Sequence, residues 1–346
     1  MFKKFLQSLF DTSSEDDKTI NILMVGASGV GKTSTLTAMY DKFNKVINQN
    51  IELQLIPDDT TSNKLNKKLI ELKKQIATDL IRTRPTLAGT KDFDEFKFMI
   101  AKDEDAKQRV NLVFKDFPGG YLETERKTVK TWIKESDVII IPIDTPSLIE
   151  KNSIYNEEAN APEKLYDIFK SIKGSFETKN RLVIFVPLKS EKYLEGNLYY
   201  TNPIRDLVES EFSNLISLFD STSLRNRVST VITSIQTIGD IKFSMIEEEI
   251  QGRPIFIYKK KGFGAKYNPI DTEQPLKYIL SFAIAEVMKK RGTIHKFISR
   301  IFNLDSEFME ALKEFSKDYK QDHNFVILQG TEFLKPLENL TNIEKK

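Results

Sequence analysis

The sequence predicts an α/β fold in which helices flank a mostly parallel central sheet. Short apolar runs rich in Val and Ile alternate with segments of helical periodicity, the order expected for strand–helix–strand units. Two of these runs, residues 138–143 and 182–186, are apolar throughout, as strands covered on both faces are. Another candidate strand, residues 20–25, leads directly into a glycine-rich turn and a helix over residues 32–43.

The first hundred residues contain several further elements. Apolar spacing in residues 1–10 predicts a short amphipathic helix, and the acidic, serine-rich residues 11–17 predict a linker. We expect a short strand over 51–56, then an amphipathic helix over 62–81 and a turn-rich stretch over 82–90. The helix over 62–81 is indicated by apolar residues at helical spacing: Leu65, Leu69, Leu72, Ile76 and Leu80.

The rest of the chain continues the alternation and ends in a helical region. The remaining predicted strands cover residues 93–100, 110–114 and 228–232, and the remaining predicted helices cover 127–135, 161–172, 204–219, 275–288 and 294–319. We therefore expect an N-terminal segment and linker (1–17), an α/β domain (18–292) with an insertion at about 45–88, and a helical C-terminal extension and tail (293–346).

Composition narrows the chemistry that the chain can perform. Its 346 residues include 52 Lys and Arg against 50 Asp and Glu, and this balance argues against a dedicated nucleic-acid binder. The absence of Cys excludes disulfides, thiolate zinc sites, iron–sulfur clusters and cysteine nucleophiles. Two isolated histidines, His295 and His323, argue against a His-rich metal site or a Ser-His-Asp triad. The functional groups that remain available for binding or catalysis are Lys, Ser and Thr side chains, carboxylates and backbone amides.

No segment of the sequence is apolar over the roughly 20 residues that a membrane-spanning helix needs. The N-terminus has neither the continuous apolar core nor the cleavage site of a signal peptide, so a cytoplasmic location is expected. The apolar face of residues 1–10, with Lys3 and Lys4 beside it, suits either weak docking on an anionic membrane or docking on a protein surface.

A phosphate-binding motif follows the first strand. Residues 26–33 read Gly-Ala-Ser-Gly-Val-Gly-Lys-Thr and match G-x-x-x-x-G-K-[ST] at every fixed position. Glycines let backbone N–H groups point inward around an anion, and the following helix adds its positive dipole end. Lys32 brings a charge to the β- and γ-phosphates, and the Thr33 hydroxyl is a ligand for Mg²⁺. The candidate phosphate-binding residues are Gly26, Ser28, Gly29, Val30, Gly31, Lys32, Thr33 and Ser34.

A second motif, Asp-Phe-Pro-Gly at residues 116–119, follows the candidate strand over 110–114. Asp116 at a strand end can hold Mg²⁺ through water, and the Gly119 N–H can donate to a γ-phosphate and so sense its presence. Alone, these four residues form an ordinary turn sequence. Their place after the phosphate-binding motif, at the end of an apolar strand, favours the functional interpretation.

Together these motifs resemble those of the Ras-like P-loop GTPases. That family carries [NT]-K-x-D after a later strand, and here residues 187–193 contain Lys189 at the family's Lys and Glu191 in place of its Asp. The resemblance implies that the Lys189 stem covers guanine and that Glu191 accepts the guanine N1–H and N2–H pair. Leu188 departs from the family's Asn or Thr. The family's fifth element would fall at Ser234 and Ile235. The implied cofactors are GTP or GDP and Mg²⁺.

A narrower resemblance is to the bacterial double-GTPase-like proteins. It rests on residues 187–193, on residues 235–239, and on Pro269 followed by residues 273–278, and it spans about residues 20–290. It implies a Ras-like fold, GTP binding, and an unidentified effector or companion GTPase-type protein as partner.

The resemblance also implies a switch threonine before the strand at 93–100, and both Thr90 and Thr86 are candidates, Thr90 first. Either threonine would be a third Mg²⁺ ligand beside Thr33 and Asp116. The alternative interpretation is that each is an ordinary loop residue. Lys32, Gly119, Gly120 and Arg84 form the candidate catalytic set.

The chain lacks the usual residue that orients the attacking water. Ras-like enzymes have a Gln at this position, and here it is Gly120, so we expect slow GTP hydrolysis. Arg84 could stabilise transition-state charge, or simply face solvent. Glu123 and Glu125 could orient water, although acidic residues at an exposed helix start are the plainer interpretation.

The sequence thus predicts a Mg²⁺-dependent, GTP-binding switch protein that hydrolyses GTP slowly and regulates a partner. Two alternatives remain open. One is a P-loop ATPase or nucleotide kinase, and the other is a scaffold that binds nucleotide without hydrolysing it. The helix predicted at 62–81 either couples nucleotide state to a partner or packs on the domain.

Overall fold

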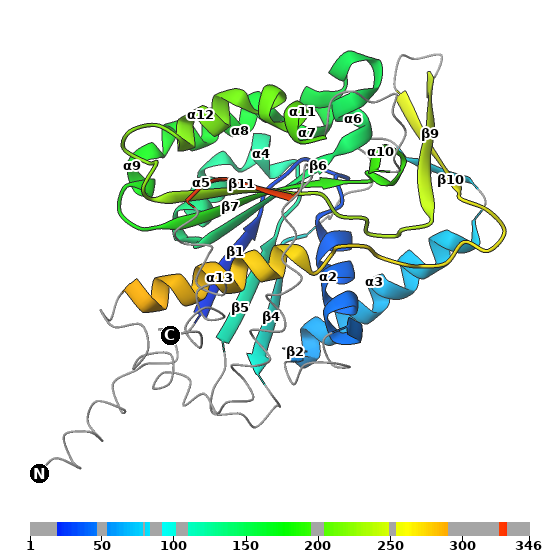
Figure 1. Ribbon diagram of the computed structural model, residues 1–346, viewed down its shortest axis with the longest axis horizontal. Helices are drawn as coiled ribbons and strands as arrows, with labels where there is room; N and C mark the ends of the chain where they lie inside the picture. Colours follow the sequence, from blue (N-terminus) through cyan, green and yellow to red (C-terminus); the bar gives the residue numbers. More distant parts are fainter. Residues whose placement is uncertain are drawn as a thin grey trace, which may run out of the picture.

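The computed structural model describes residues 19–46, 54–78, 80–83, 92–101, 110–194, 204–248, 254–289 and 325–330. These residues form a large sheet of eight strands and a small sheet of three, with helices around the large sheet (Figure 1). Residues 1–17 and the helix predicted at 294–319 lie outside the described residues, so the predictions made for them stay predictions. Among the described residues, no helix is long and apolar enough to cross a membrane.

The central sheet is mostly parallel, as the sequence predicts. Its strands are, in spatial order, β11 (Phe325–Gln329), β8 (Val228–Thr233), β7 (Arg181–Leu188), β6 (Val138–Asp144), β1 (Thr19–Met24), β5 (Val110–Asp116), β4 (Asp94–Ala101) and β2 (Gln54–Pro57). The five strands from β8 to β5 run parallel, and β11, β4 and β2 join the edges antiparallel. With a glycine-rich turn leading from the central strand into a helix, this α/β arrangement is that of a P-loop NTPase.

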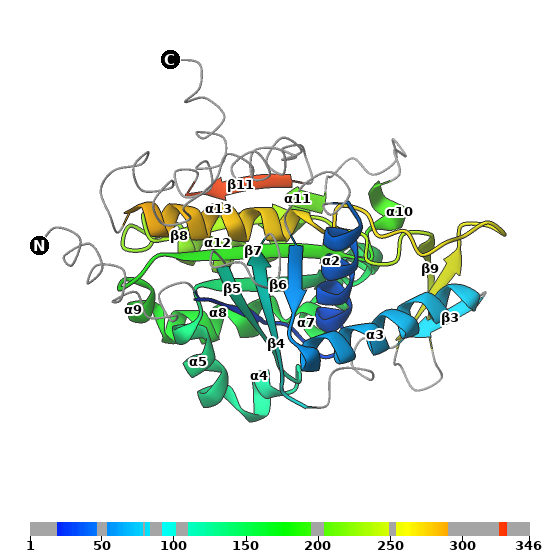
Figure 2. The same cartoon turned by 90° about the horizontal axis from the view of Figure 1, so that it is seen from below.

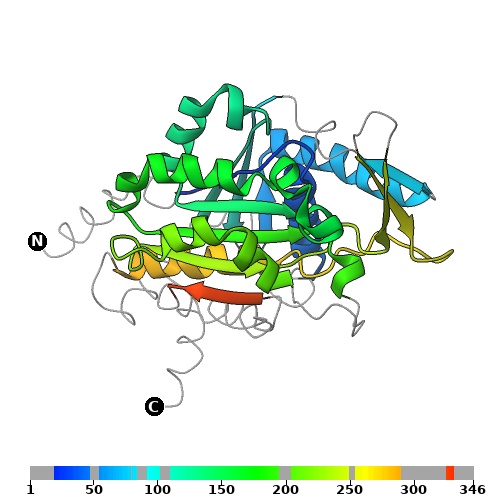
Figure 3. The same ribbon diagram turned by 90° about the horizontal axis from the view of Figure 1, so that it is seen from above.

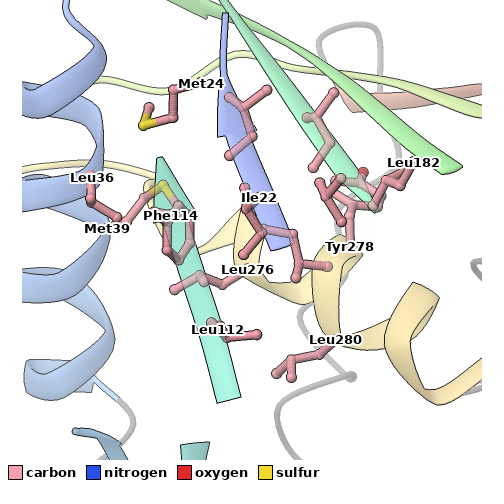
Figure 4. Packing of buried hydrophobic residues seen from close by; sticks show 14 of the residues in the cluster. Ile22, Met24, Leu36, Met39, Leu112, Phe114, Leu182, Leu276, Tyr278 and Leu280 are labelled. Carbon is pink, nitrogen blue, oxygen red and sulfur yellow. The ribbon is translucent and has the colours of Figure 1, made fainter. Parts of the chain in front are cut away.

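Helices cover both faces of this sheet because its central strands are apolar on both sides. In β1 the side chains alternate: Ile22 and Met24 belong to one buried cluster, and Leu23 to the other. The first cluster packs under α2 (Lys32–Val46) and α13 (Gln274–Lys289), as Figure 4 shows. The second packs under α5 (Arg126–Glu135), α8 (Pro162–Ser171), α11 (Ile204–Glu211) and α12 (Ser213–Phe219), and Figure 3 shows helices of this face, in green, over the sheet.

Short helices connect these layers. They are α4 (Tyr121–Thr124), α6 (Thr145–Ile149), the 3₁₀ helix η2 (Glu150–Ser153), α7 (Asn156–Asn160), α9 (Lys173–Phe176) and α10 (Glu191–Leu194). The single helix predicted over 204–219 is divided at Phe212, whose φ of −105° and ψ of 19° leave the helical region. Phe212 is buried, with its ring centroid 5.5 Å from that of Phe185 on β7, so the break falls at a residue that packs against the sheet.

The helix predicted at 62–81 is wrong at its C-terminal end. The observed helix α3 is Asp59–Ala77, and Leu80–Thr83 is instead strand β3, paired antiparallel with β10 (Pro254–Lys260). β9 (Ile241–Glu248) completes this second sheet. The pairing joins segments about 175 residues apart, which helical periodicity cannot reveal.

Asp58 caps α3 by accepting a hydrogen bond from the Thr61 N–H at 2.7 Å.

Candidate functional site

The glycine-rich turn between β1 and α2 has the backbone that its sequence predicts. Gly29 has φ 77° and Gly31 has φ 116°, conformations that residues with a side chain rarely adopt. A Cβ at Gly31 would also lie 3.0 Å from the Leu188 side chain. Lys32 is the first residue of α2, so the free N–H groups at the start of this helix face the turn. The turn is therefore built to place backbone N–H groups around an anion.

Lys32 is buried in this turn, with 4% of its surface exposed. Its ammonium donates to the carbonyl oxygens of Gly26 at 3.0 Å and Ala27 at 3.2 Å. Burial lowers the pKa of Lys32, and the negative charge of Asp116 partly opposes that shift. Carbonyl oxygens carry no net charge, so an incoming phosphate would give this buried cation a full counter-charge.

Asp116 and Thr33 lie together beside the turn. Asp116 ends β5, opposite Met24 at the end of β1, and its side chain is fully buried. The Thr33 hydroxyl donates to Asp116 Oδ2 at 2.5 Å. A carboxylate and a hydroxyl are hard oxygen donors of the kind that Mg²⁺ takes, together with phosphate oxygens and water. These two residues therefore fit the predicted metal site.

Gly119 lies against the phosphate-binding turn. A Cβ on Gly119 would lie 2.0 Å from the Ser28 backbone nitrogen and 2.3 Å from the Ala27 carbonyl carbon. Only glycine permits this approach, so the Asp-Phe-Pro-Gly segment and the turn are in backbone contact. Gly120 differs, because a Cβ there would meet nothing within 4 Å. We call residues 26–34 and 116–119 the phosphate end of the site.

Lys189 follows β7 in a left-handed conformation, with φ 57°. Its ammonium forms an ion pair with the Asp144 carboxylate and lies 5.8 Å from the centre of the Tyr258 ring. Asp144 also caps α6, where its Oδ1 accepts from the N–H of Ser147 at 3.0 Å and from its hydroxyl at 2.9 Å. Asp144 thus fixes the position of Lys189, a role that the sequence analysis missed. In the sequence, the feature that could have indicated this role is the position of Asp144 at the end of an apolar strand.

Glu191 is almost completely buried, with 3% of its surface exposed. Burial raises the pKa of Glu191 to about 7. Hydrogen bonds from the backbone of Glu191 and Gly239, and the positive charges of Lys261 and Lys189, lower this pKa and so partly oppose the effect of burial. The carboxyl therefore changes its charge near neutral pH. We call Lys189, Glu191 and their surroundings on β10 and after β8 the base end of the site.

One pocket of about 920 Å³ joins the two ends. The phosphate end contributes residues 29–34, and the base end contributes Lys189, Glu191 and Tyr258. Residues of α3, β3 and the start of β4 complete its walls. The structure thus brings the phosphate-binding motif and the Lys189–Glu191 motif, more than 150 residues apart in the chain, to the same cavity.

The predicted fifth element lies behind the pocket wall. Ser234 and Ile235 are buried and are not among the described residues that line the pocket. The Ile235 N–H donates to the Pro187 carbonyl at 3.1 Å, so this segment braces β7. Thr237 and Ile238, two to three residues later, line the pocket instead. The end of the apolar strand β8 indicated this region of the chain, but it did not show that Thr237 and Ile238, rather than Ser234 and Ile235, line the pocket.

Arg84, Thr86 and Thr90 lie outside the described residues, so their proposed roles remain predictions. Glu123 is exposed and forms an ion pair with Lys164. The neighbouring Glu125 accepts from the Thr128 hydroxyl at 3.4 Å, and neither acid lines the pocket.

Two solved structures of one GTPase-like domain resemble the chain at low sequence identity. No protein-family model and no curated protein matches the chain. Among solved structures, the GTPase-like domain of S. cerevisiae Ski7 bound to GDP and inorganic phosphate matches with a TM-score of 0.36 and 12% identity. The same domain bound to GTP matches with a TM-score of 0.37 and 13% identity. Each match covers 67% of this chain and 45% of the other.

Proposed function

We propose that this protein is a P-loop guanine-nucleotide-binding protein that takes GTP or GDP with Mg²⁺ and hydrolyses GTP slowly. One observation carries the proposal: residues 29–34 of the phosphate-binding turn and the pair Lys189 and Glu191 line a single pocket. A ligand with a polyphosphate at one end and a purine at the other matches both sets of groups. The nucleotide's phosphates would replace the carbonyls that Lys32 now contacts.

At the phosphate end, the residues have distinct tasks. The N–H groups of the turn and of α2 bind the phosphate oxygens, and Lys32 neutralises the β- and γ-phosphates. Thr33 and Asp116 would hold the Mg²⁺ ion, which supplies charge neutralisation at the phosphates when bound. Gly119, whose contact with the turn at Ser28 supports this role, would respond to a γ-phosphate.

At the base end, Glu191 accepts the two N–H groups of guanine when it is ionised, and Lys189 lies over the base. Adenine presents no such pair of donors to a carboxylate. With adenine, the buried and ionised Glu191 would gain no donors from the ligand to offset its burial, so guanine is favoured and adenine is penalised. Thr237 and Ile238 form the adjoining wall.

Hydrolysis would proceed by attack of water on the γ-phosphorus and release of GDP and inorganic phosphate. The chain has Gly120 where a water-orienting Gln is typical, so the turnover expected is slow. A residue of a partner protein, or Arg84 and the switch threonine (Thr86 or Thr90), would complete the site. The likeness to the bacterial double-GTPase-like proteins supports a companion protein as that partner.

The test is to denature the purified protein and identify the released nucleotide by chromatography, then to repeat this after loading with an equimolar GTP and ATP mixture. Guanine nucleotide in both samples is the expected result. Adenine nucleotide in both would favour an ATPase or nucleotide kinase. Protein that retains neither nucleotide would contradict the proposal.

A second candidate is a scaffold that binds GTP without hydrolysing it, and Gly120 favours it. Single-turnover phosphate release over several hours separates the two. Gly120→Gln sharpens the comparison, because no atom lies within 4 Å of the position of a Cβ at Gly120, so a side chain can begin there without a clash. We expect slow release from the wild type and faster release from the variant. If both release no phosphate, the protein is a nucleotide-binding scaffold.

A further inference from the structure

Helix α3 runs along the whole nucleotide pocket. Near its start, Lys64 pairs with Asp94 at 2.5 Å, and Asp94 lies opposite Asp116 in the register of β4 and β5. At its end, the Ala77 carbonyl accepts from Lys260 of β10 at 3.4 Å. Figures 1 and 2 show the helix, in light blue, reaching from β2 toward the small sheet. α3 therefore extends from the phosphate end to the base end.

One face of α3 forms a wall of the pocket. The helix contributes lining residues at spacings of one, four, five and eight positions, which place them on adjoining parts of one face. Leu65, on the neighbouring side of α3, belongs to the buried cluster that packs under α2 and so holds the helix on the domain. These lining residues are Lys67, Lys68, Glu71, Leu72 and Gln75.

The two lysines of this wall lie at the middle of α3, nearer than Gln75 to the Lys64–Asp94 pair. Lys67 and Lys68 follow Lys64 by three and four residues, so at about 1.5 Å per residue they lie about 5–6 Å further along the axis. Gln75 lies about 12 Å beyond Lys67 on the same scale, toward β3. The positively charged part of the wall therefore lies closer to the Lys64–Asp94 pair than Gln75 does, and it shares the pocket with Lys32 and Thr33.

Neither Lys67 nor Lys68 forms a strong ion pair with another described residue. Lys68 pairs with Glu71 at 3.0 Å, but the Lys68 side chain is 32% exposed and that of Glu71 is 50% exposed, and such surface pairs contribute little. Lys67 has no ion pair with any residue in the part of the chain that the structure describes. Both ammonium groups can therefore turn to an anion in the pocket at little cost.

We propose that Lys67 and Lys68 bind the phosphate chain of the nucleotide from the side opposite the phosphate-binding turn, so that α3 retains the nucleotide in the pocket. This inference rests on the proposed nucleotide-binding function. Two cations on one wall and Lys32 on the other would enclose the polyphosphate. Charge-assisted contacts of this kind are the strong class of hydrogen bond, so their loss should show as faster release.

The experiment measures the dissociation rate of fluorescent GTP and GDP analogues at fixed Mg²⁺ and ionic strength. The test variant is Lys67→Ala/Lys68→Ala. The control is Lys42→Ala/Lys74→Ala, which removes the same charge from α2 and from α3 at positions that do not line the pocket. Lys67→Arg, which keeps the charge, serves as a rescue variant, and thermal unfolding checks that every variant is folded.

We expect the test variant to release both analogues about tenfold faster, with the control within twofold of the wild type and Lys67→Arg close to it. Equal release from test variant, control and wild type would overturn the inference. The proposed function would survive that result if Lys32→Ala still lowered GTP affinity by at least about 100-fold. A wild-type protein that binds neither analogue would overturn both.

Discussion

The two ends of the pocket are built in different ways. The phosphate end comes from two short stretches, residues 26–34 and 116–119, held by backbone contacts such as that of Gly119 with Ser28. The base end combines Lys189 and Glu191 with Thr237 and Tyr258, from three separate parts of the chain. Side chains rather than backbone shape it, through the ion pair of Lys189 with Asp144 and the burial of Glu191.

This difference predicts different responses to substitution. At the phosphate end, each position has a fixed backbone and little room, so small changes should have large effects. At the base end, the charge of Glu191 and the position of Lys189 set specificity, so substitutions there should change which nucleotide binds before they abolish binding.

The largest effect is expected at Lys32. Lys32→Ala removes the buried cation that a triphosphate would contact, and we expect GTP affinity to fall by at least about 100-fold, about 3 kcal/mol. Equilibrium titration with a fluorescent GTP analogue at fixed Mg²⁺ measures this. Lys42→Ala, further along α2 and away from the pocket, is the control and should bind normally. Normal affinity in the Lys32 variant would reject the phosphate site.

The next effect is expected at Gly119. Gly119→Ala places a Cβ within about 2 Å of the turn's backbone, which cannot move aside as a flexible side chain can. Overpacking of this kind costs about 1–3 kcal/mol, so both the free energy of unfolding and GTP affinity should fall. Gly120→Ala is the matched control, because its Cβ meets nothing within 4 Å. Equal denaturation midpoints for the two variants would show that the contact at Gly119 is unimportant.

At Glu191 the expected change is in specificity. Burial raises the pKa of Glu191 to about 7, so the carboxyl is mostly protonated at pH 6 and mostly ionised at pH 8. Only the ionised form accepts both guanine N–H groups, so the preference for GTP over ATP should rise across this range, by up to about tenfold. Competition titrations at pH 6, 7 and 8 measure it.

Glu191→Gln should remove this pH dependence and lower the preference for GTP, because the amide carries no charge at either pH. Glu177→Gln, at an exposed position, should behave as the wild type. A preference that varies with pH in the same way in all three proteins would contradict the assignment of Glu191 to the base.

The sequence predicted the parallel strands of the central sheet and the backbone of the glycine-rich turn, because both have local patterns. It did not predict the edge strand β11, which lies in residues expected to form a helical extension. Buried parallel strands are recognisable from their apolar runs, and the turn at residues 26–33 has its pattern within eight residues. In the small sheet, β3 was missed because it pairs with β10 about 175 residues away and continues an apolar helical pattern. β9 and β10 are consecutive strands that pair antiparallel, and the sequence analysis assigned no strand to either. Asp144 was missed because its task depends on Lys189, 45 residues later.

The most direct test is calorimetric titration of the wild-type protein with a non-hydrolysable GTP analogue in the presence of Mg²⁺, beside the matching ATP analogue. We predict that one GTP analogue binds per chain and that the ATP analogue binds more weakly. No heat of binding with either analogue, or equal affinity for both, would contradict the account.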